Sequence, residues 1–127
     1  MSRQPDTPYG PGPLRGLRVL VAEDDAWTAD HIGLILEEEG ARLIGPCSTV
    51  AAARRLLDER QVEFVLVDLN LSDNFADELI EDSRRRNIPF AIITGYQALP
   101  TNAYEGAEEV FLKPIQRRML IEMLARF

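Results

Sequence analysis

The stretch FVLVDL, Phe64–Leu69, decides the fold class, because it is a short apolar run that ends next to an acid. Similar apolar runs occupy residues 17–22, 41–46, 90–94 and 110–113, and helical patterns occupy residues 26–39, 49–59, 76–86 and 115–127. Short runs rich in Val, Ile, Leu and Phe that alternate with helices are typical of strands buried on both faces of a parallel sheet. The sequence therefore predicts an α/β, doubly wound, five-stranded parallel sheet.

Two segments do not follow this alternation. Residues 1–16 are rich in proline and glycine, so they are predicted to be a disordered tail before one folded domain at residues 17–127. Residues 95–109 contain a proline, two glycines and an asparagine, so the fourth helix is predicted to be short or irregular. Ser48 or Thr49 is a candidate N-cap of the second helix, Gly40 is a candidate C-cap of the first, and Pro114 suits the first turn of the last helix.

Composition excludes several classes of function. The 127 residues carry a net charge of -7, which disfavours binding to nucleic acid or to an anionic membrane surface. No apolar run approaches the roughly 18 residues that span a bilayer, and the first residues lack the apolar core of a signal peptide. Cys47 is the single cysteine, so neither an internal disulfide nor a thiolate zinc cluster is expected. The predicted location is the cytoplasm.

Unusual polar residues follow four of the five predicted strands. Glu23 and Asp24 follow the first strand, Asp68 ends the third, Thr94 ends the fourth and Lys113 ends the fifth. The carboxyl ends of parallel strands meet at one edge, where α/β sheets bind their ligands. The sequence therefore predicts a single site of three acids, a hydroxyl and an amine.

This set of groups suits phosphoryl transfer. Clustered carboxylates repel one another unless a cation neutralises them, and oxygen ligands without histidine favour Mg²⁺. A carboxylate can then attack phosphorus, while Lys113 and Thr94 stabilise the oxygens of the transferred group. Asp68 is the better candidate nucleophile because it stands alone at its strand end, whereas Glu23 and Asp24 are adjacent and suited to share the metal.

Four motifs resemble the receiver domain of bacterial two-component response regulators, in the order of that family: VLVAEDD (Val19–Asp25), VLVDLNL (Val65–Leu71), IITG (Ile92–Gly95) and FLKP (Phe111–Pro114). The resemblance covers residues 17–127 and implies a flavodoxin-like sheet with strand order 2-1-3-4-5. It implies that Asp68 is the phosphoacceptor, that Thr94 is the switch hydroxyl and that Lys113 pairs with the phosphoryl group. It also implies that Glu23, Asp24, Asp68 and the backbone carbonyl of Asn70 bind Mg²⁺, and that the Lys113–Pro114 peptide is cis.

One position departs from the family pattern. Receivers usually carry Tyr or Phe three residues before the lysine as a rotamer switch, and here that residue is Val110. Phe111 is adjacent, but alternation along a strand directs it to the opposite face. The sequence FAIITG, residues 90–95, also partly resembles a receiver subfamily with a Phe-Ala-Thr-Gly signature that lacks this switch and partners HWE-type histidine kinases.

The chain ends after its last predicted helix, so a stand-alone receiver is expected, and the resemblance implies a phosphoacceptor that is not an enzyme. It would accept a phosphoryl group on Asp68 from a histidine kinase or a histidine phosphotransfer protein, and signal through an unknown downstream protein. It would be a monomer or a phosphorylation-linked dimer. Two alternatives remain: a degenerate or phosphate-sink receiver that acts mainly as a docking module, and a haloacid-dehalogenase-type phosphatase. That phosphatase family needs an acid two residues after its nucleophile, where this chain has Asn70.

Overall fold

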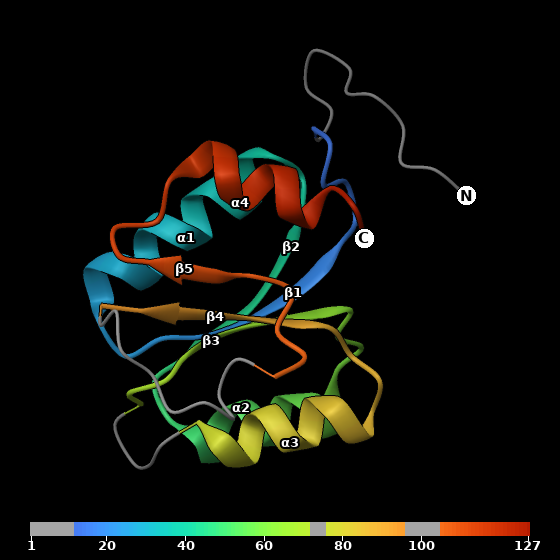
Figure 1. Cartoon of the computed structure of the whole chain (residues 1–127). Helices are drawn as coiled ribbons and strands as arrows, with labels where there is room; N and C mark the ends of the chain where they lie inside the picture. Colours follow the sequence, from blue (N-terminus) through green and yellow to red (C-terminus); the bar gives the residue numbers. More distant parts are fainter. Residues whose placement is uncertain (1–11, 72–75, 96–104) are drawn as a thin grey trace.

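The computed structural model of the chain describes residues 12–71, 76–95 and 105–127 (Figure 1). Along the chain the elements are β1 (Arg18–Ala22), α1 (Ala26–Glu38), β2 (Arg42–Cys47), α2 (Val50–Glu59), β3 (Phe64–Asp68), α3 (Asp77–Arg85), β4 (Phe90–Thr94), β5 (Val110–Leu112) and α4 (Arg117–Leu124). The helix expected between β4 and β5 falls mainly on residues 96–104, outside the described residues. Within the described ranges, no helix has the length and apolar character needed to cross a membrane.

The five strands form one parallel sheet in the order β2-β1-β3-β4-β5. The order changes direction at β1, because β2 lies on one side of it and β3 lies on the other. This arrangement confirms the predicted doubly wound, flavodoxin-like sheet and its strand order.

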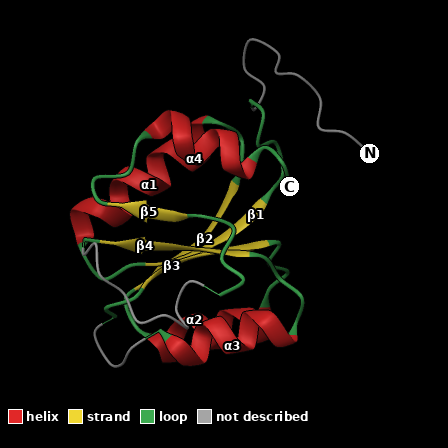
Figure 2. Cartoon of the chain, in the orientation of Figure 1, coloured by secondary structure: helices red, strands yellow, loops and turns green. Residues whose placement is uncertain are grey.

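Helices cover both faces of the sheet. Helices α1 and α4 lie on one face, and α2 and α3 lie on the other (Figure 2). Successive residues of a strand point to opposite faces, so Val19 and Val21 pack in the core beneath α1 and α4, while Leu20 and Ala22 pack in the core above α2 and α3. The central strands are therefore buried on both faces, which explains their continuous apolar sequences.

Local side chains fix the helix ends. Thr49, one of the two predicted candidates, caps α2 by accepting a hydrogen bond from the N–H of Ala52 at 3.1 Å. Asp25 caps α1 in the same way, through the N–H of Thr28 at 2.9 Å. Gly40, directly after the C-cap residue of α1, has a φ of 90°, a conformation that glycine adopts without steric cost.

The start of the last helix differs from the prediction. Helix α4 begins at Arg117 with Gln116 as its N-cap, so Pro114 lies before the helix and not in its first turn. The Lys113–Pro114 peptide is cis, as the resemblance implied, and Gly45–Pro46 is a second cis peptide that the sequence analysis did not anticipate.

Part of the segment predicted as a tail packs against the domain. Leu14 is fully buried in the core beneath α1 and α4. Its N–H donates to the carbonyl of Glu39 at 3.1 Å, and the N–H of Gly16 donates to the carbonyl of Gly40 at 2.9 Å. The packed part of the chain thus begins before residue 17, because one buried leucine and two backbone hydrogen bonds hold residues 14–16 against the end of α1.

Candidate functional site

The sheet aligns the strand ends that carry the predicted site residues. Ala22 of β1 pairs with Val67 of β3, directly before Glu23 and Asp68. On the other side of β3, Asp68 pairs with Ile93, and Thr94 of β4 pairs with Leu112 of β5. The backbone N–H of Lys113 donates to the carbonyl of Thr94 at 2.9 Å, which extends this pairing by one residue. The register therefore brings all four strand ends to one edge.

Lys113 bridges two buried acids at this edge. Its Nζ lies 3.2 Å from Asp68 Oδ2 and 3.0 Å from Glu23 Oε2, and it donates a hydrogen bond to each. The Glu23 side chain is inaccessible to solvent, and the Asp68 side chain is almost as buried. A single ammonium group therefore faces two carboxylates from different strands.

Backbone amides position both carboxylates. Oδ1 of Asp68 accepts a hydrogen bond from the N–H of Asn70 at 3.0 Å. Oε2 of Glu23 accepts one from the N–H of Asp25 at 3.0 Å. These two contacts give each of the two buried carboxylates a defined orientation.

The buried position of Glu23 changes its acidity. Burial is the largest influence, and together with the neighbouring Asp68 carboxyl it raises the pKa of Glu23 from 4.5 to about 7. The N–H of Asp25 and the Lys113 ammonium act in the opposite direction without cancelling the rise. For Lys113, burial lowers the pKa, but the hydrogen bonds and charges of Glu23 and Asp68 outweigh burial and raise it. Lys113 is therefore charged at neutral pH.

Three of the acids have the spacing of a cation site. Glu23, Asp24 and Asp68 each offer a carboxylate oxygen, and these oxygens lie within 4.8 Å of one another. Lys113 Nζ lies 2.9 Å from Glu23 Oε1, but without hydrogen-bonding geometry, so this buried oxygen has no hydrogen-bond partner among the described residues. An unpaired buried carboxylate oxygen beside two other acids fits a hard divalent cation such as Mg²⁺, which prefers oxygen ligands.

The remaining predicted residues lie around this cluster. Thr94 is buried at the end of β4, and Asn70 is exposed in the loop after β3. Val110 is half-buried on the α2–α3 side of the sheet, while Phe111 is buried on the α1–α4 side. Phe111 therefore faces away from the position that the usual aromatic switch would occupy. Tyr96, two residues past Thr94, is expected to flank the path of the attacking water together with Asn70, and it lies outside the described residues.

Asp25, a third acid after the first strand, contributes to the site through a backbone contact that sequence reasoning missed. The N–H of Asp25 holds Glu23, and Asp25 also caps α1 through Thr28. The only available signal was the acidic residue one position before the first helical residue, which is typical of an N-cap. Every residue except proline has a backbone N–H, so the identity of residue 25 does not indicate that its N–H contacts Glu23.

Comparison with known proteins identifies relatives of this fold and sequence. The family model of the response regulator receiver domain matches residues 19–125. The sensory transduction protein LytT of Bacillus cereus is 27% identical over 115 residues, covering 87% of this chain and 47% of LytT. The cell cycle transcriptional regulator CtrA of Caulobacter vibrioides is 30% identical over 118 residues, covering 87% of this chain and 48% of CtrA. The chain thus spans about half the length of these curated relatives.

Solved structures agree with the sequence matches. A CheY-like response regulator receiver domain from Methanospirillum hungatei has a TM-score of 0.78 at 25% identity, covering 87% of this chain and 92% of the other. A sensor protein from Polaromonas has a TM-score of 0.76 at 29% identity, covering 87% and 94% of the two chains. Both similarities extend over most of the described domain.

Proposed function

Because the chain belongs to the response regulator receiver domain family of two-component systems, we propose that Asp68 accepts a phosphoryl group from a phosphohistidine of a sensor kinase or a phosphotransfer protein. The observation that carries this proposal is the setting of the Asp68 carboxylate. It is buried at the carboxyl edge of the sheet, 3.2 Å from an ammonium group and beside two further acids. Family membership also decides against the haloacid-dehalogenase-type phosphatase.

The proposed reaction moves the phosphoryl group from nitrogen to oxygen. A carboxylate oxygen of Asp68 forms the new O–P bond while the N–P bond of the phosphohistidine breaks, and the electron pair of that bond stays on the imidazole nitrogen. Lys113 is already adjacent to Asp68, so its ammonium can pair with an oxygen of the transferred group. Thr94 is proposed to donate its hydroxyl to another of these oxygens.

Receiver domains bind Mg²⁺ at an acidic pocket, and this chain has such a cluster of acids. We assign the metal to Glu23, Asp24 and Asp68, with the backbone carbonyl of Asn70 as a further ligand. Bound there, the cation would neutralise the negative charge of these acids and stabilise the charge on the phosphoryl oxygens. The unpaired Oε1 of Glu23 supports its assignment as a ligand.

The output is proposed to pass through contacts with another protein, in the cytoplasm. A rotamer change of the usual aromatic residue cannot signal phosphorylation of Asp68, because Val110 replaces that residue and Phe111 lies in the core on the opposite face of the sheet. Val110 is also the observation that favours the second candidate function, a receiver that acts mainly by docking. Assignment to the Phe-Ala-Thr-Gly subfamily and a stand-alone arrangement both stay predictions.

Intact mass measurement tests the proposal. Wild-type protein is incubated with acetyl phosphate and MgCl₂, and it should gain the mass of one phosphoryl group. Asp68→Asn should gain nothing, and addition of excess EDTA should suppress the adduct of the wild type. Asp30→Asn, which removes an exposed acid from α1, is the matched control and should be modified like the wild type.

Two results would contradict phosphoacceptance by Asp68. One is an equal adduct on Asp68→Asn, which would place the group elsewhere. The other is a wild type that gains no adduct from either acetyl phosphate or phosphoramidate, which would favour the docking function.

A further inference from the structure

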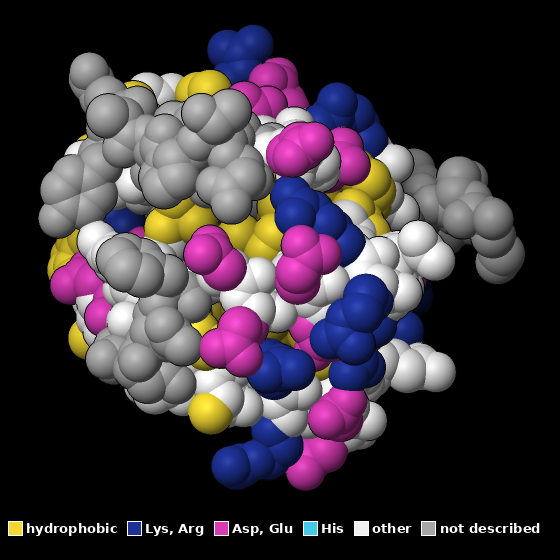
Figure 3. Space-filling view, turned by 60° about the horizontal axis from the view of Figure 1, so that its bottom comes forward, with side chains coloured by type: hydrophobic (Ala, Val, Ile, Leu, Met, Phe, Trp, Pro, Cys, Tyr) yellow, Lys and Arg dark blue, Asp and Glu magenta, His cyan; other side chains and the backbone are white. Residues whose placement is uncertain are grey.

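We propose that the groove between α2 and α3 binds an acidic peptide segment of a partner protein. The groove has a volume of about 500 Å³ and is open to solvent. Its charged lining consists of Arg54, Arg55, Asp58, Asp82, Arg85 and Arg86, which we call the arginine groove. Figure 3 shows this side of the molecule, where basic and acidic side chains gather over the two helices. The groove uses none of the proposed phosphorylation residues, so the two proposals stand independently.

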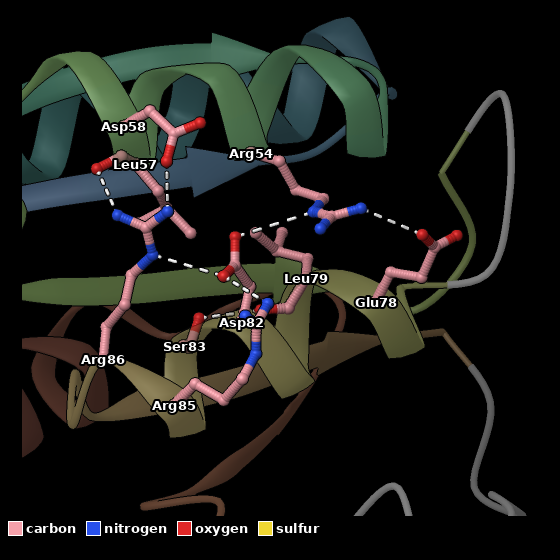
Figure 4. A network of polar contacts seen from close by, with 9 residues as sticks. All are labelled: Arg54, Leu57, Asp58, Glu78, Leu79, Asp82, Ser83, Arg85 and Arg86. Atoms are coloured by element: carbon pink, nitrogen blue, oxygen red, sulfur yellow. Dashed lines mark hydrogen bonds and ion pairs between the residues drawn. The ribbon is translucent and has the colours of Figure 1, made fainter.

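A buried carboxylate organises the groove. Asp82 of α3 is only 3% exposed, and three guanidinium groups surround it. Its nearest nitrogens are Nη2 of Arg85 at 2.7 Å, Nε of Arg86 at 3.2 Å and Nε of Arg54 at 3.6 Å. Figure 4 shows Asp82 between Arg54 of α2 on one side and Arg85 and Arg86, at the C-terminal end of α3, on the other. One negative charge therefore gathers three positive charges from two helices.

Further contacts hold two of these arginines at their outer ends. Nη1 of Arg54 donates to Glu78 at 3.0 Å. Nη1 of Arg86 donates to the carbonyl of Leu57 at 2.8 Å, and Nη2 of Arg86 pairs with Asp58. Ordering a long side chain costs free energy when a ligand has to do it, and here intramolecular contacts have already ordered them. The groove is preorganised for a ligand that accepts hydrogen bonds.

Positive charge in the groove exceeds its negative charge. Four arginines line it against the two acids Asp58 and Asp82, and with Glu78, which pairs with Arg54, one positive charge is in excess, in a chain whose net charge is -7. In the described part of the chain, no carboxylate pairs with Arg55, which is exposed on α2. The Arg85 side chain is 65% exposed and uses only Nη2 for Asp82. Arg55 and Arg85 thus line the groove with guanidinium donors that are available to a ligand.

The lining indicates the class of ligand. Among the described residues, Ala51 is the only apolar one in the lining, and none of the lining side chains is an aromatic ring that could stack on a base or a sugar. Asp58 and Asp82 lie among the arginines, so a compact polyanion would contact these carboxylates as well. Carboxylates spaced along an extended peptide can reach separate guanidinium groups and avoid the two acids. An Asp- or Glu-rich segment is therefore the ligand that the charges favour.

The experiment uses a synthetic octaglutamate peptide as the probe and the full chain labelled with ¹⁵N. Titration should shift backbone amide signals of α2 and α3, and the shifts should shrink as NaCl is added. In Arg55→Gln/Arg85→Gln the dissociation constant should rise about three- to tenfold, as expected for the loss of two exposed ion pairs. Arg42→Gln/Arg118→Gln removes the same charge from other exposed sites and should bind within about twofold of the wild type.

Three outcomes would overturn the proposal. The first is a set of shifts spread over the whole surface, and the second is equal weakening in both double variants, since each indicates a general charge effect. The third is pyrophosphate producing the α2 and α3 shifts while octaglutamate does not, which would identify a site for compact anions. The single variant Arg55→Gln removes no ion pair among the described residues. Weaker octaglutamate binding by this variant would therefore not be explained by the loss of an intramolecular ion pair.

Discussion

Glu23→Gln should stabilise the metal-free protein at neutral and alkaline pH. The Glu23 side chain is closed to solvent, and its pKa is raised to about 7, mainly by burial and by the neighbouring Asp68 carboxyl. Between the unfolded and folded pKa values the folded protein binds the proton and the unfolded chain does not. The contribution of protonated Glu23 to the free energy of unfolding is therefore fully present below about pH 4.5. This contribution is lost as the pH rises through about 7.

The size of the effect follows from these two values. The difference between 4.5 and about 7 corresponds to about 3 kcal/mol of unfolding free energy, at about 1.4 kcal/mol for each pKa unit. Most of this loss, about 2 to 3 kcal/mol, falls between pH 5 and pH 8. Glutamine keeps the shape of the side chain and carries no charge, so the variant should escape this loss.

Urea unfolding in EDTA at pH 5 and pH 8 measures the difference. The wild type should lose about 2 to 3 kcal/mol more than Glu23→Gln across this interval. Glu37→Gln, which alters an exposed acid on α1, is the control and should follow the wild type. If Glu23→Gln and the wild type lose stability in parallel, ionisation of Glu23 is not the source of the pH dependence and the reasoning fails.

Three further expectations concern the site and the core. Adding MgCl₂ at pH 8 should raise the urea midpoint of the wild type, and the size of this rise gives a dissociation constant for Mg²⁺. Asp24→Asn should increase that dissociation constant by about tenfold or more. An unchanged constant would show that Asp24 is not a metal ligand. Lys113→Ala should destabilise the metal-free protein at pH 8 by about 3 kcal/mol, because it leaves two buried carboxylates without the neighbouring ammonium group. In urea unfolding, MgCl₂ should restore part of this loss. An unchanged free energy of unfolding would show that Lys113 does not compensate the charge of these acids. Leu14→Ala should cost about 3 kcal/mol in the same assay if its side chain is part of the core, whereas a cost near zero would return residues 12–16 to the predicted tail.

The sheet could be predicted because local pattern and final environment agree. The run at Phe64–Asp68 is apolar on both faces, and the structure buries it on both faces. The strand order followed from the resemblance, and the grouping of Asp68 with Lys113 followed from the rule that parallel strands end at one edge. Because the strands are in register, the residues at their carboxyl ends lie side by side. Asp68 and Lys113, 45 residues apart in the sequence, could therefore be placed together.

Features that depend on distant contacts could not be predicted in this way. Leu14 sits in a segment whose composition indicates disorder, and only the end of α1 and the core beside it explain its burial. Pro114 fits a helix start by residue type, yet α4 begins three residues later. Asp82 looks like an ordinary surface acid of an amphipathic helix, and its contact with Arg54 of another helix could not be read from the local sequence. For Leu14 and Asp82, these partners are remote in sequence.

The division of the interior into two cores has a consequence for how such a protein can diversify. The sheet separates the side chains beneath α1 and α4 from those above α2 and α3, so the two sets share strand backbone but not packing surfaces. Substitutions in separate, non-contacting sets contribute to the free energy of unfolding almost additively. The helices on one face of the sheet can therefore accumulate substitutions and acquire a new outer surface. The packing on the opposite face, and the positions of the strand ends, need not change.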